Sequence, residues 1–595
     1  MKLALIYPPF YAKQFNENLG TVDDQFGLFP HVAFGWIAAV AKQCGWQVRL
    51  IDAAAERIDP REAIDQIESW NPDLLGFAAH AAQTIQDMYG WARVIRRETG
   101  IASMVGGYEA KAYPHEIMEQ GCFDFLAAGD APAMLPEFLS AFERGHGYED
   151  VPSLVYQASG EARFSGRTAP HIPFSEFPIP DRSIFPNHLY YSHVSQRRNF
   201  TIGISEVGCP YPCSFCCMRR TGFSARSPEQ VIEELEQCIA LGIREIDWFD
   251  PLMLHDRTRV IEIAREIKRR RLDIIWSCRS RVDSLSFHRA EGAVDEELIE
   301  SLAEGGCRRI YFGIESGDDA VLKQMSKGQK ICSTQRNVLA SVREAGIMSL
   351  GFFILGAPGD TPETCKRTVS LALSLPLSYA QFQIAIIKPH TELERDHIVE
   401  GSGIDYWRDY VRGRVGEREL PNPWTEMSRA ALEATAKRAY FQFYARPRYI
   451  LMMLRRIESS RELYRYARVA LQLLLRPVRA SEDSGRSRPR RLGRAAGAFV
   501  EAVLNPRSQG ARHPVIRMGG GIRGACRLAM AEWRWRREEK GVDPASPVPA
   551  DPVNGAIIPP PAPTQGAHVL PGRYVPFLDA IPFANGRAIS ETAID

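Results

Sequence analysis

The feature that most restricts the fold of this chain is a loop in which four cysteines lie within nine residues. Cys209, Cys213 and Cys216 have the spacing C-x3-C-x2-C, Cys217 follows directly, and a strand-like run over residues 200–204 comes before them. Three thiolates on one loop can bind three irons of a four-iron four-sulfur (4Fe-4S) cluster, whereas ordinary ferredoxin clusters use four cysteines. The spacing therefore predicts a 4Fe-4S cluster with one iron left open for another ligand.

Two other interpretations of these cysteines stay open at this point: a zinc site, or unrelated buried thiols. Zinc sites usually show two separated pairs of ligands, and the sequence has no second pair with this spacing. Unrelated thiols have no reason to fall on the first loop of a strand-helix pattern. The other eight of the twelve cysteines are scattered, as expected of reduced thiols in a cytosolic chain. Cys217 breaks the spacing, and we interpret it as a neighbour of the cluster.

Residues 199–400 alternate between strand-like and helix-like runs, which predicts a partial, TIM-like βα barrel. The strand-like runs cover residues 200–204, 245–249, 273–277, 309–313, 349–355 and 382–387. The helix-like runs cover residues 228–241, 257–270, 295–304, 333–345 and 362–375. Active sites of such barrels gather at the carboxyl ends of the strands. Asp250, Arg281 and Glu315 each follow a strand at that end, so together they predict a ligand-binding face, although any one alone is more simply a solvated charge.

Residues 1–145 alternate in the same way and predict an α/β domain with a doubly wound parallel sheet. The strand-like runs cover residues 2–7, 47–51, 73–79, 102–105 and 123–128, with helix-like runs between them. Ligands of such sheets bind beyond the carboxyl ends of the strands. The residues at or near those ends include Pro9, Asp52, His80, Gly106, Gly107 and Gly129. Paired glycines let the backbone approach a large flat ligand, but they can also serve only as turns, and His80 can equally be a packing residue.

The rest of the chain predicts connections rather than catalytic domains. We expect a linker over residues 146–198, a helical C-terminal domain over residues 401–478, and an Arg-rich, then Pro-rich, largely disordered tail over residues 479–595. Lys plus Arg number 73 and Asp plus Glu 72, a net charge of +1 that argues against a nucleic-acid partner. The sequence has no apolar run of about 18 residues, and its N-terminus lacks the features of a signal peptide, so we expect a cytoplasmic protein.

The motif C-x3-C-x-φ-C on the first loop of a partial βα barrel resembles the radical S-adenosylmethionine (radical SAM) superfamily. The resemblance implies that Cys209, Cys213 and Cys216 hold the 4Fe-4S cluster and that S-adenosylmethionine binds the open iron. One electron then cleaves S-adenosylmethionine to methionine and a 5′-deoxyadenosyl radical. The contacts of S-adenosylmethionine that the resemblance implies are Phe215, Asp250, Arg281, Glu315 and Gly356.

The segment 226–229, Arg-Ser-Pro-Glu, opens the first barrel helix as in the subgroup that also carries a cobalamin-binding domain, to which residues 1–145 are similar. The resemblance implies cobalamin as a further cofactor, bound at the strand ends of the N-terminal sheet. Two positions depart from the family pattern. Asp52 is followed by Ala-Ala-Ala-Glu-Arg, so the motif D-x-H-x-x-G, whose histidine ligates cobalt, is absent. Residues 205–208, Ser-Glu-Val-Gly, stand where the subgroup usually has Ser-Arg-Gly.

These cofactors imply an enzyme that transfers a methyl group to an unactivated centre of a small molecule or natural-product intermediate. The electron would come from an external donor such as flavodoxin or ferredoxin. One alternative is an oxidative cyclase acting on a tetrapyrrole or lipid-like substrate, similar to the anaerobic magnesium-protoporphyrin ester cyclase. Another is a non-catalytic sensor of the cluster or of cobalamin. The Arg-rich residues 476–494, next to the apolar residues 471–475, would also suit peripheral membrane contact, although a solvated linker is the simpler interpretation.

Overall fold

The computed structural model of the chain describes residues 1–9, 27–192, 194–197, 199–286, 291–386, 388–400, 403–416 and 424–455. All of them lie in one compact unit, Met1–Arg456. The predicted tail with its Arg-rich stretch, and residues 456–478 of the predicted helical domain, lie outside the described residues. Among the helices of the described part, none has both the length and the apolar character of a membrane span.

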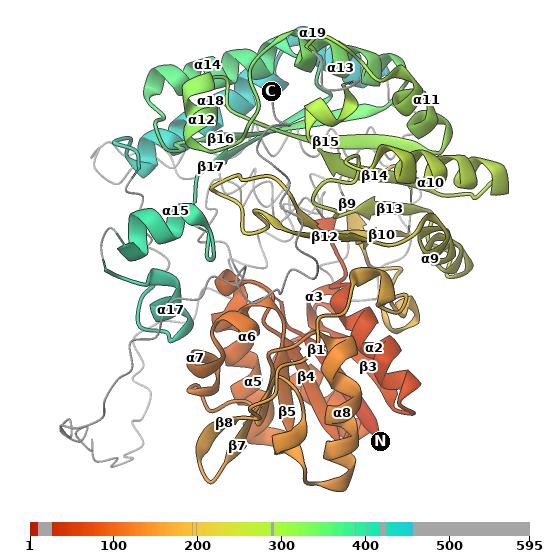
Figure 1. Ribbon diagram of the computed structural model, residues 1–595, viewed down its shortest axis with the longest axis vertical. Coiled ribbons are helices and arrows are strands. Elements are labelled where there is room, and N and C mark those ends of the chain that lie inside the picture. Colours follow the sequence, from red (N-terminus) through yellow and green to blue (C-terminus); the bar gives the residue numbers. More distant parts are fainter. Residues whose placement is uncertain are drawn as a thin grey trace, which may run out of the picture. The chain divides into compact units, whose positions relative to one another are not determined.

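The N-terminal part forms a seven-stranded sheet, drawn in red to orange in Figure 1. In order across the sheet its strands are β3 (Gln47–Asp52), β1 (Lys2–Tyr7), β4 (Leu74–Ala78), β5 (Ser103–Gly106), β6 (Phe125–Ala127), β7 (Leu154–Ala158) and β8 (Glu161–Phe164). The first five run parallel, which confirms the predicted α/β fold. β7 and β8 are antiparallel and come from residues expected to be a linker. That part of the expected linker instead extends the sheet as a short hairpin.

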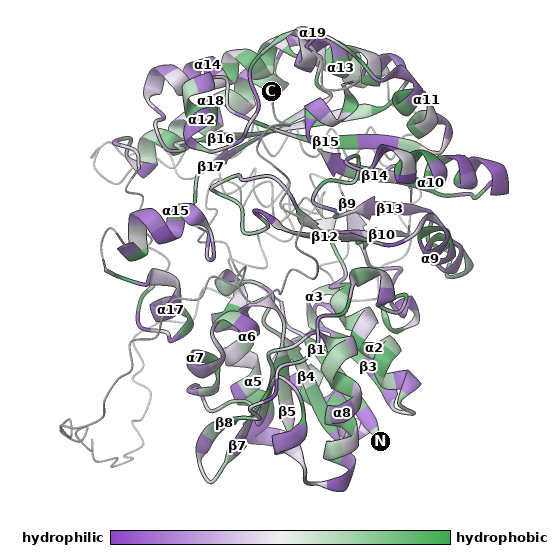
Figure 2. Cartoon of the chain, in the orientation of Figure 1, coloured by the Kyte–Doolittle hydropathy of each residue, from purple (hydrophilic) through white to green (hydrophobic). Residues whose placement is uncertain are grey.

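Alternate residues of β1 face the two layers of helices that cover this sheet. Leu3 and Leu5 pack against α2 (Ala33–Gln43) and α8 (Ala131–Arg144). Ala4 and Ile6 pack on the other face, in a core shared with α4 (Pro60–Trp70) and α5 (Ile85–Thr99). This apolar interior is visible as green strands in Figure 2. The shorter helices around the sheet are α3 (Ala53–Glu56), α6 (Tyr108–Ala112) and α7 (Pro114–Met118).

The second sheet has six parallel strands and confirms the predicted partial barrel. Its strands are β10 (Phe200–Gly203), β13 (Glu245–Trp248), β14 (Ile275–Ser280), β15 (Cys307–Glu315), β16 (Met348–Leu355) and β17 (Tyr379–Ile384). The helices that connect them are α9 (Pro228–Ala240), α10 (Arg257–Arg270), α11 (Glu296–Glu304), α12 (Asp319–Gln324), α13 (Ser333–Glu344) and α14 (Pro362–Ser374). A hairpin of β11 (Glu206–Cys209) and β12 (Thr221–Ala225) lies between β10 and α9 and carries the cysteine loop.

The region after the barrel serves both sheets instead of forming one separate helical domain. Helix α17 (Tyr406–Val411) packs into the core of the N-terminal domain, where the side-chain amide of Gln86 donates to the Tyr410 carbonyl at 2.6 Å. Helix α18 (Arg429–Tyr444) covers the edge strand β17, and the hydroxyls of Tyr440 and Tyr444 accept the backbone N–H groups of Phe382 and Ala380. These bonds satisfy a strand edge that would otherwise be left unpaired. Helix α19 (Pro447–Arg455) follows.

The segment between the sheets contacts both, as its position between the two domains suggests. Tyr190 donates its hydroxyl to the Asp52 carboxylate of the N-terminal domain at 2.6 Å. Arg182, buried with 2% of its surface exposed, forms an ion pair with Glu234 of α9 and donates to Thr201 Oγ1 at 2.9 Å. A short pairing of β2 (Gly27–Leu28) with β9 (Tyr191–Ser192) adds a further link.

Candidate functional site

The cysteine loop is held by its hairpin and by two later parts of the barrel. At Gly208 the backbone φ is +87°, and a Cβ atom there would lie 1.9 Å from the Gly222 carbonyl oxygen, so only glycine fits. The backbone N–H of Ser214 donates to the Met325 carbonyl at 3.0 Å, and the Ser214 carbonyl accepts the N–H of Leu393 at 3.1 Å. The loop is therefore fixed to the segments after α12 and β17.

The three predicted cluster ligands lie within electrostatic range of one another and of two cations. Burial raises the pKa of Cys209 and of Cys213, Cys216 raises both further, and Arg281 and Lys327 oppose the rise. These cations compensate negative charge on thiolates, the form that binds metal. In the described residues no three His, Cys, Asp or Glu side chains gather tightly enough for a single metal ion. A cubane cluster binds each thiolate through a different iron and needs no such common point.

Cys217 is a hydrogen-bonding neighbour of Cys216. This hydrogen bond raises the pKa of Cys216 and lowers that of Cys217. The ion pair between Arg219 and Glu392 of α15 (Glu392–Glu394), at 2.9 Å, holds the same end of the loop. Cys217 thus contacts Cys216, and its position next to a bound cluster stays a prediction.

Arg281 and Glu315, two of the three charged residues expected to form one face, come together with Phe215 of the cysteine loop. The Glu315 carboxylate pairs with Lys327 Nζ at 2.8 Å, and that ammonium lies 5.9 Å from the Phe215 ring centre. The Arg281 guanidinium donates to the Lys327 carbonyl at 2.7 Å and stands 3.9 Å from the Tyr211 ring. Glu315 has a backbone φ of +68°, which is unusual for a residue other than glycine.

Asp250 does not face this open side of the barrel. Its carboxylate is completely buried and accepts the backbone N–H groups of Ser205 and Glu206, at 2.6 and 3.2 Å, and the Ser205 hydroxyl. Burial raises the pKa of Asp250 to about 6, against these hydrogen bonds. The structure thus corrects the predicted direct contact with S-adenosylmethionine: Asp250 fixes the start of the cysteine hairpin.

Glu206 and Arg259 complete this support and were not predicted as site residues. The Glu206 carboxylate accepts the Leu252 N–H at 2.9 Å and lies 3.6 Å from the Arg259 guanidinium. Burial, and then the neighbouring Asp250, raise the pKa of Glu206 to about 8. The sign of this role in the sequence is that residues 205–208, which include Glu206, depart from the usual Ser-Arg-Gly of the subgroup.

Gly356 also makes contacts other than those expected. Its N–H donates to the Asp360 carboxylate at 2.8 Å and its carbonyl accepts Trp424 Nε1 at 3.0 Å. The N–H and the carbonyl of Gly356, a predicted S-adenosylmethionine contact, are therefore both engaged within the chain. The neighbouring Ile354 and Ala357 form an apolar cluster with Phe215, which offers a flat ring a surface beside the cysteine loop.

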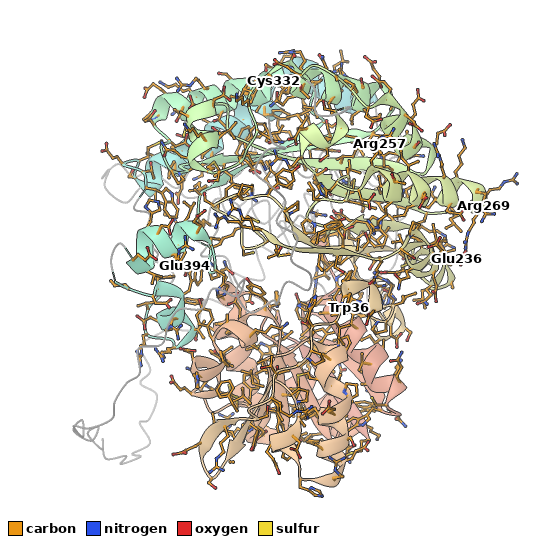
Figure 3. The ribbon with its side chains drawn as sticks, viewed as in Figure 1. Trp36, Glu236, Arg257, Arg269, Cys332 and Glu394 are labelled. Carbon is orange, nitrogen blue, oxygen red and sulfur yellow. The ribbon has the colours of Figure 1, made fainter. Side chains whose placement is uncertain are left out.

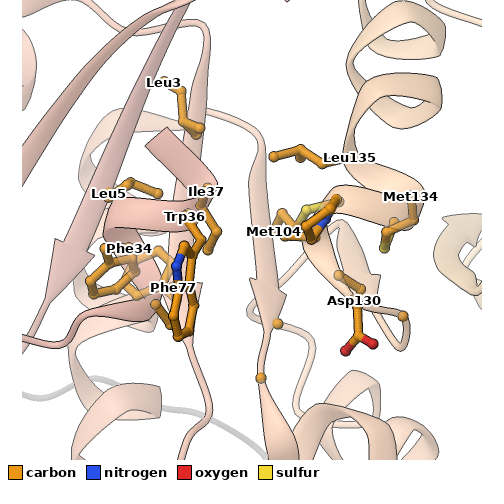
Figure 4. A pocket seen from close by; sticks show the side chains of 18 of the residues that line it. Leu3, Leu5, Phe34, Trp36, Ile37, Phe77, Met104, Asp130, Met134 and Leu135 are labelled. Atoms are coloured by element: carbon orange, nitrogen blue, oxygen red, sulfur yellow. The ribbon is translucent and has the colours of Figure 1, made fainter. Parts of the chain in front are cut away.

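In the N-terminal domain, a cavity of about 280 Å³ lies over the sheet. Figure 4 shows residues of α2 on one side and Met134 and Leu135 of α8 on the other, with Leu3 and Leu5 of β1 also lining the cavity. Its lining is mainly apolar and also includes Trp36, Phe77, Met104, Gly106, Gly107, Tyr108, Gly129 and Asp130. Such a cavity fits the apolar part of a large cofactor whose flat ring lies above it.

The predicted glycines form the edge of this cavity where β5 and β6 end. Gly107 has φ +115°, and a Cβ atom there would lie 2.7 Å from the Ala79 carbonyl oxygen. A Cβ atom at Gly129 would lie 3.0 Å from the Ser153 side chain. At Gly107 and Gly129 the neighbouring chain therefore passes too close for an unstrained side chain. Gly106, Gly107 and Gly129 all line the cavity, and their contact with cobalamin stays a prediction.

The other three predicted cobalamin residues, Asp52, His80 and Pro9, have different surroundings. Asp52 is 1% exposed, caps α3 through the Ala55 N–H at 2.9 Å and accepts Tyr190, which corrects its predicted role as an open ligand contact. His80 lies at the strand end beside the ring of His31, with ring centres 4.6 Å apart. Pro9 is half-buried and is the last described residue before the gap that begins at residue 10.

Tyr108, which follows the paired glycines at the end of β5, connects the two parts of the site. It lines the cavity, and its ring packs against that of His390. The segment of His390 also reaches the cysteine loop, because the N–H of Leu393, three residues later, donates to the Ser214 carbonyl at 3.1 Å. The buried Glu109 carboxylate pairs with His390 Nε2 at 3.1 Å, and the Tyr108 and His390 ring centres are 5.1 Å apart. Glu394, labelled in Figure 3, accepts the His390 N–H at 2.6 Å.

Comparison with known proteins agrees with this division of the chain. Residues 205–372 match the model of the Radical SAM superfamily and residues 26–139 that of the B12 binding domain, so the chain contains both domains. The cofactors that these domains imply are a 4Fe-4S cluster, S-adenosylmethionine and cobalamin.

Two curated relatives and one solved structure illustrate the similarity. The uncharacterized methyltransferase PH0819 of Pyrococcus horikoshii is 27% identical over 463 residues, 76% of this chain and 94% of that protein. The anaerobic magnesium-protoporphyrin IX monomethyl ester cyclase of Rubrivivax gelatinosus is 22% identical over 58% of this chain and 62% of its own length. The cobalamin-dependent S-adenosylmethionine radical enzyme OxsB, solved with aqua-cobalamin and S-adenosylmethionine, shares the fold with a TM-score of 0.59, 16% identity, and coverage of 90% of this chain and 79% of that one.

Proposed function

We propose that this chain is a cobalamin-dependent radical SAM methyltransferase acting on a small molecule. The observation that carries the proposal is the position of Tyr108, which lines the proposed cobalamin cavity and packs against His390, in the segment whose Leu393 N–H bonds to the cysteine loop. A substrate beside Tyr108 would be near both cofactor sites. When bound, the cluster with S-adenosylmethionine supplies a 5′-deoxyadenosyl radical, and cobalamin supplies a transferable methyl group.

The chain's own residues bind and orient. Cys209, Cys213 and Cys216 would hold the cluster, while Arg281 and Lys327 compensate its negative charge. Phe215 and Glu315 would complete the S-adenosylmethionine contacts with Arg281. Such positioning is the main contribution of a protein to cofactor chemistry, and no side chain has to act as a general acid or base.

A second candidate is the oxidative cyclase reaction, because the matched part of this chain also resembles the magnesium-protoporphyrin cyclase relative. The cyclase would use the same cluster, S-adenosylmethionine and cobalamin sites without methyl transfer to the substrate. In either reaction we expect the electron to come from an external flavodoxin- or ferredoxin-like donor. The sites themselves therefore do not separate these two reactions.

The test uses the full chain reconstituted without oxygen, with iron, sulfide and cobalamin. S-adenosylmethionine with a deuterated methyl group is added with a low-potential reductant, and mass spectrometry follows 5′-deoxyadenosine and the label on cobalamin. A methyltransferase places the label on cobalamin, whereas retained cobalamin without label favours the cyclase reaction. Cys213→Ala should abolish 5′-deoxyadenosine formation. Cys44→Ala, which changes an exposed cysteine distant in sequence from the cysteine loop, should leave this formation unchanged.

A further inference from the structure

The outer surface of α18 and α19 exposes large apolar side chains to water. Phe441 of α18 is 66% exposed, the highest value among the large apolar side chains that the structure describes. Ile450 and Leu451 of α19 follow each other directly and are 48% and 49% exposed. Apolar side chains that are exposed as a group, with polar residues around them, mark an interaction surface.

Two cations lie on the same face of α18 as Phe441. Lys437 and Arg438 precede it by four and three positions, a spacing that makes residues neighbours on a helix. Both are exposed, and neither forms an ion pair with another described residue. The carboxylate nearest to them in sequence, that of Glu433, pairs instead with Arg429 at 3.3 Å. The charges beside Phe441 are therefore not neutralised within the described part of the chain.

The opposite face of α18 fixes this surface to the barrel. The buried residues of this helix, at positions 432, 436, 439 and 443, lie on the side that packs against β17. The Tyr449 ring of α19 lies 5.4 Å from the Phe443 ring and 5.1 Å from the Tyr444 ring, so α19 packs on the end of α18. The exposed residues, which we call the C-terminal helix surface, are Lys437, Arg438, Phe441, Ile450 and Leu451.

The charge of this region has one sign. Residues 434–457 contain no Asp or Glu, although the whole chain has a net charge of only +1. The cations of the same range are Lys437, Arg438, Arg446, Arg448, Arg455 and Arg456. Exposed apolar side chains next to Lys and Arg are typical of helices that lie in the surface of a membrane. An anionic bilayer complements both features, because it offers negative headgroups above an apolar layer.

We propose that the C-terminal helix surface binds an anionic lipid bilayer. Phe441, Ile450 and Leu451 enter the layer below the headgroups, and Lys437 and Arg438 contact the lipid phosphates. This surface differs from the Arg-rich residues 476–494, which lie outside the described residues. It also contains none of the residues assigned to the cluster, S-adenosylmethionine or cobalamin, so the inference does not depend on the proposed function.

The experiment measures how much full-length protein sediments with lipid vesicles. One set of vesicles contains phosphatidylglycerol and phosphatidylcholine in equal parts, and the other contains phosphatidylcholine alone. We expect binding mainly to the first. The double variant Lys437→Gln/Arg438→Gln should bind this set about 25-fold more weakly, since each cation near an anionic surface contributes about fivefold. The matched variant Lys268→Gln/Arg269→Gln changes an adjacent, exposed Lys-Arg pair on α10 and should bind as the unaltered chain does.

A second set of variants tests the apolar half of the surface. Phe441→Ser, Ile450→Ser and Leu451→Ser together should weaken binding at least about tenfold, because less apolar area leaves water. The matched variant Phe164→Ser changes a side chain of β8 that is 47% exposed and should leave binding unchanged. Unfolding in urea should be the same for all variants, since only exposed side chains are altered.

Three results would overturn the inference. Equal binding to the two sets of vesicles would show that the headgroup charge is not recognised. Binding that survives both sets of substitutions would place the lipid contact elsewhere on the chain. An unaltered chain that binds neither set of vesicles is the result expected if a second copy or another part of the chain covers the C-terminal helix surface.

Discussion

Replacing Asp250 by asparagine separates two roles that the sequence could not distinguish. If Asp250 contacted S-adenosylmethionine directly, the cluster would assemble normally and only the affinity for S-adenosylmethionine would fall. In the structure its carboxylate instead accepts hydrogen bonds from Ser205 and Glu206 at the start of the cysteine hairpin. We therefore expect Asp250→Asn to impair cluster assembly first.

The size of the effect follows from these hydrogen bonds. Asparagine keeps one carbonyl oxygen and turns an NH2 group toward Ser205 or Glu206, so at least one bond is lost and one donor stays buried without a partner. Hydrogen bonds to charged groups contribute about 1.5–3 kcal/mol each, and leaving a buried donor unpaired costs about 1–3 kcal/mol. A total of about 3 kcal/mol would shift the local equilibrium of the hairpin roughly a hundredfold, since each 1.4 kcal/mol is about a factor of ten.

Iron and sulfide analysis after reconstitution, together with the affinity for S-adenosylmethionine, tests this reasoning. We expect Asp250→Asn to retain little cluster and to bind cobalamin as the unaltered chain does, because the cavity is in the other domain. The matched variant Asp273→Asn removes an exposed carboxylate, 64% exposed, before β14 and should assemble a full cluster. A full cluster with weakened S-adenosylmethionine binding in Asp250→Asn would refute the positioning role.

Three further predictions concern Gly107 at the cavity edge, the buried carboxylate of Glu206, and Arg182 in the segment between the domains. Gly107→Ala should weaken cobalamin retention at least about tenfold (about 1.4 kcal/mol), measured by equilibrium dialysis, while Gly121→Ala, which has positive φ but open space, should not. The pKa of Glu206 is raised to about 8 in the folded chain, against about 4.3 in an unfolded one. The contribution of Glu206 to the free energy of unfolding is therefore full below about pH 4.3 and is lost as the pH rises toward 8. Urea unfolding should therefore show Glu206→Gln gaining stability relative to the unaltered chain between about pH 5 and 8, and a constant difference would contradict this assignment. Arg182→Met should lower the free energy of unfolding by about 3–5 kcal/mol because it breaks a buried ion pair, against less than about 1 kcal/mol for Lys42→Met at a more exposed pair.

The parts of the fold that the sequence predicts are those with local periodic signals. Strands such as β1, β4 and β16 have largely apolar runs, and the cysteine spacing lies within one loop. Parallel strands bring their carboxyl ends to one side, so the convergence of Arg281 and Glu315 also follows from the sequence, whereas Asp250, expected with them, bonds to the start of the cysteine hairpin. The four residues of β8 alternate polar and apolar over too short a run to predict a strand by themselves.

The roles of single polar residues are harder to predict because they depend on distant partners. Asp52 follows a strand, as a ligand contact would, but its partner Tyr190 lies 138 residues further along the chain. Asp250 and Ser205 are 45 residues apart. The sequence places each carboxylate at the correct end of a sheet, and only the structure shows which hydrogen-bond donors reach it.

Tyr108 and His390 form a junction between the cavity and the cysteine loop, and the backbone of this junction bears on how a substrate would be held. His390 has a backbone φ of +63°, a conformation that costs a residue other than glycine about 1–2 kcal/mol. It persists because Glu109 holds its ring and Glu394 holds its N–H. Strained backbone is maintained only where surrounding contacts over-determine it, so the contacts that bring the cavity near the cysteine loop are formed before a substrate arrives. Selection among substrates then depends on side chains that remain accessible at the junction, of which Tyr108, 41% exposed, is one.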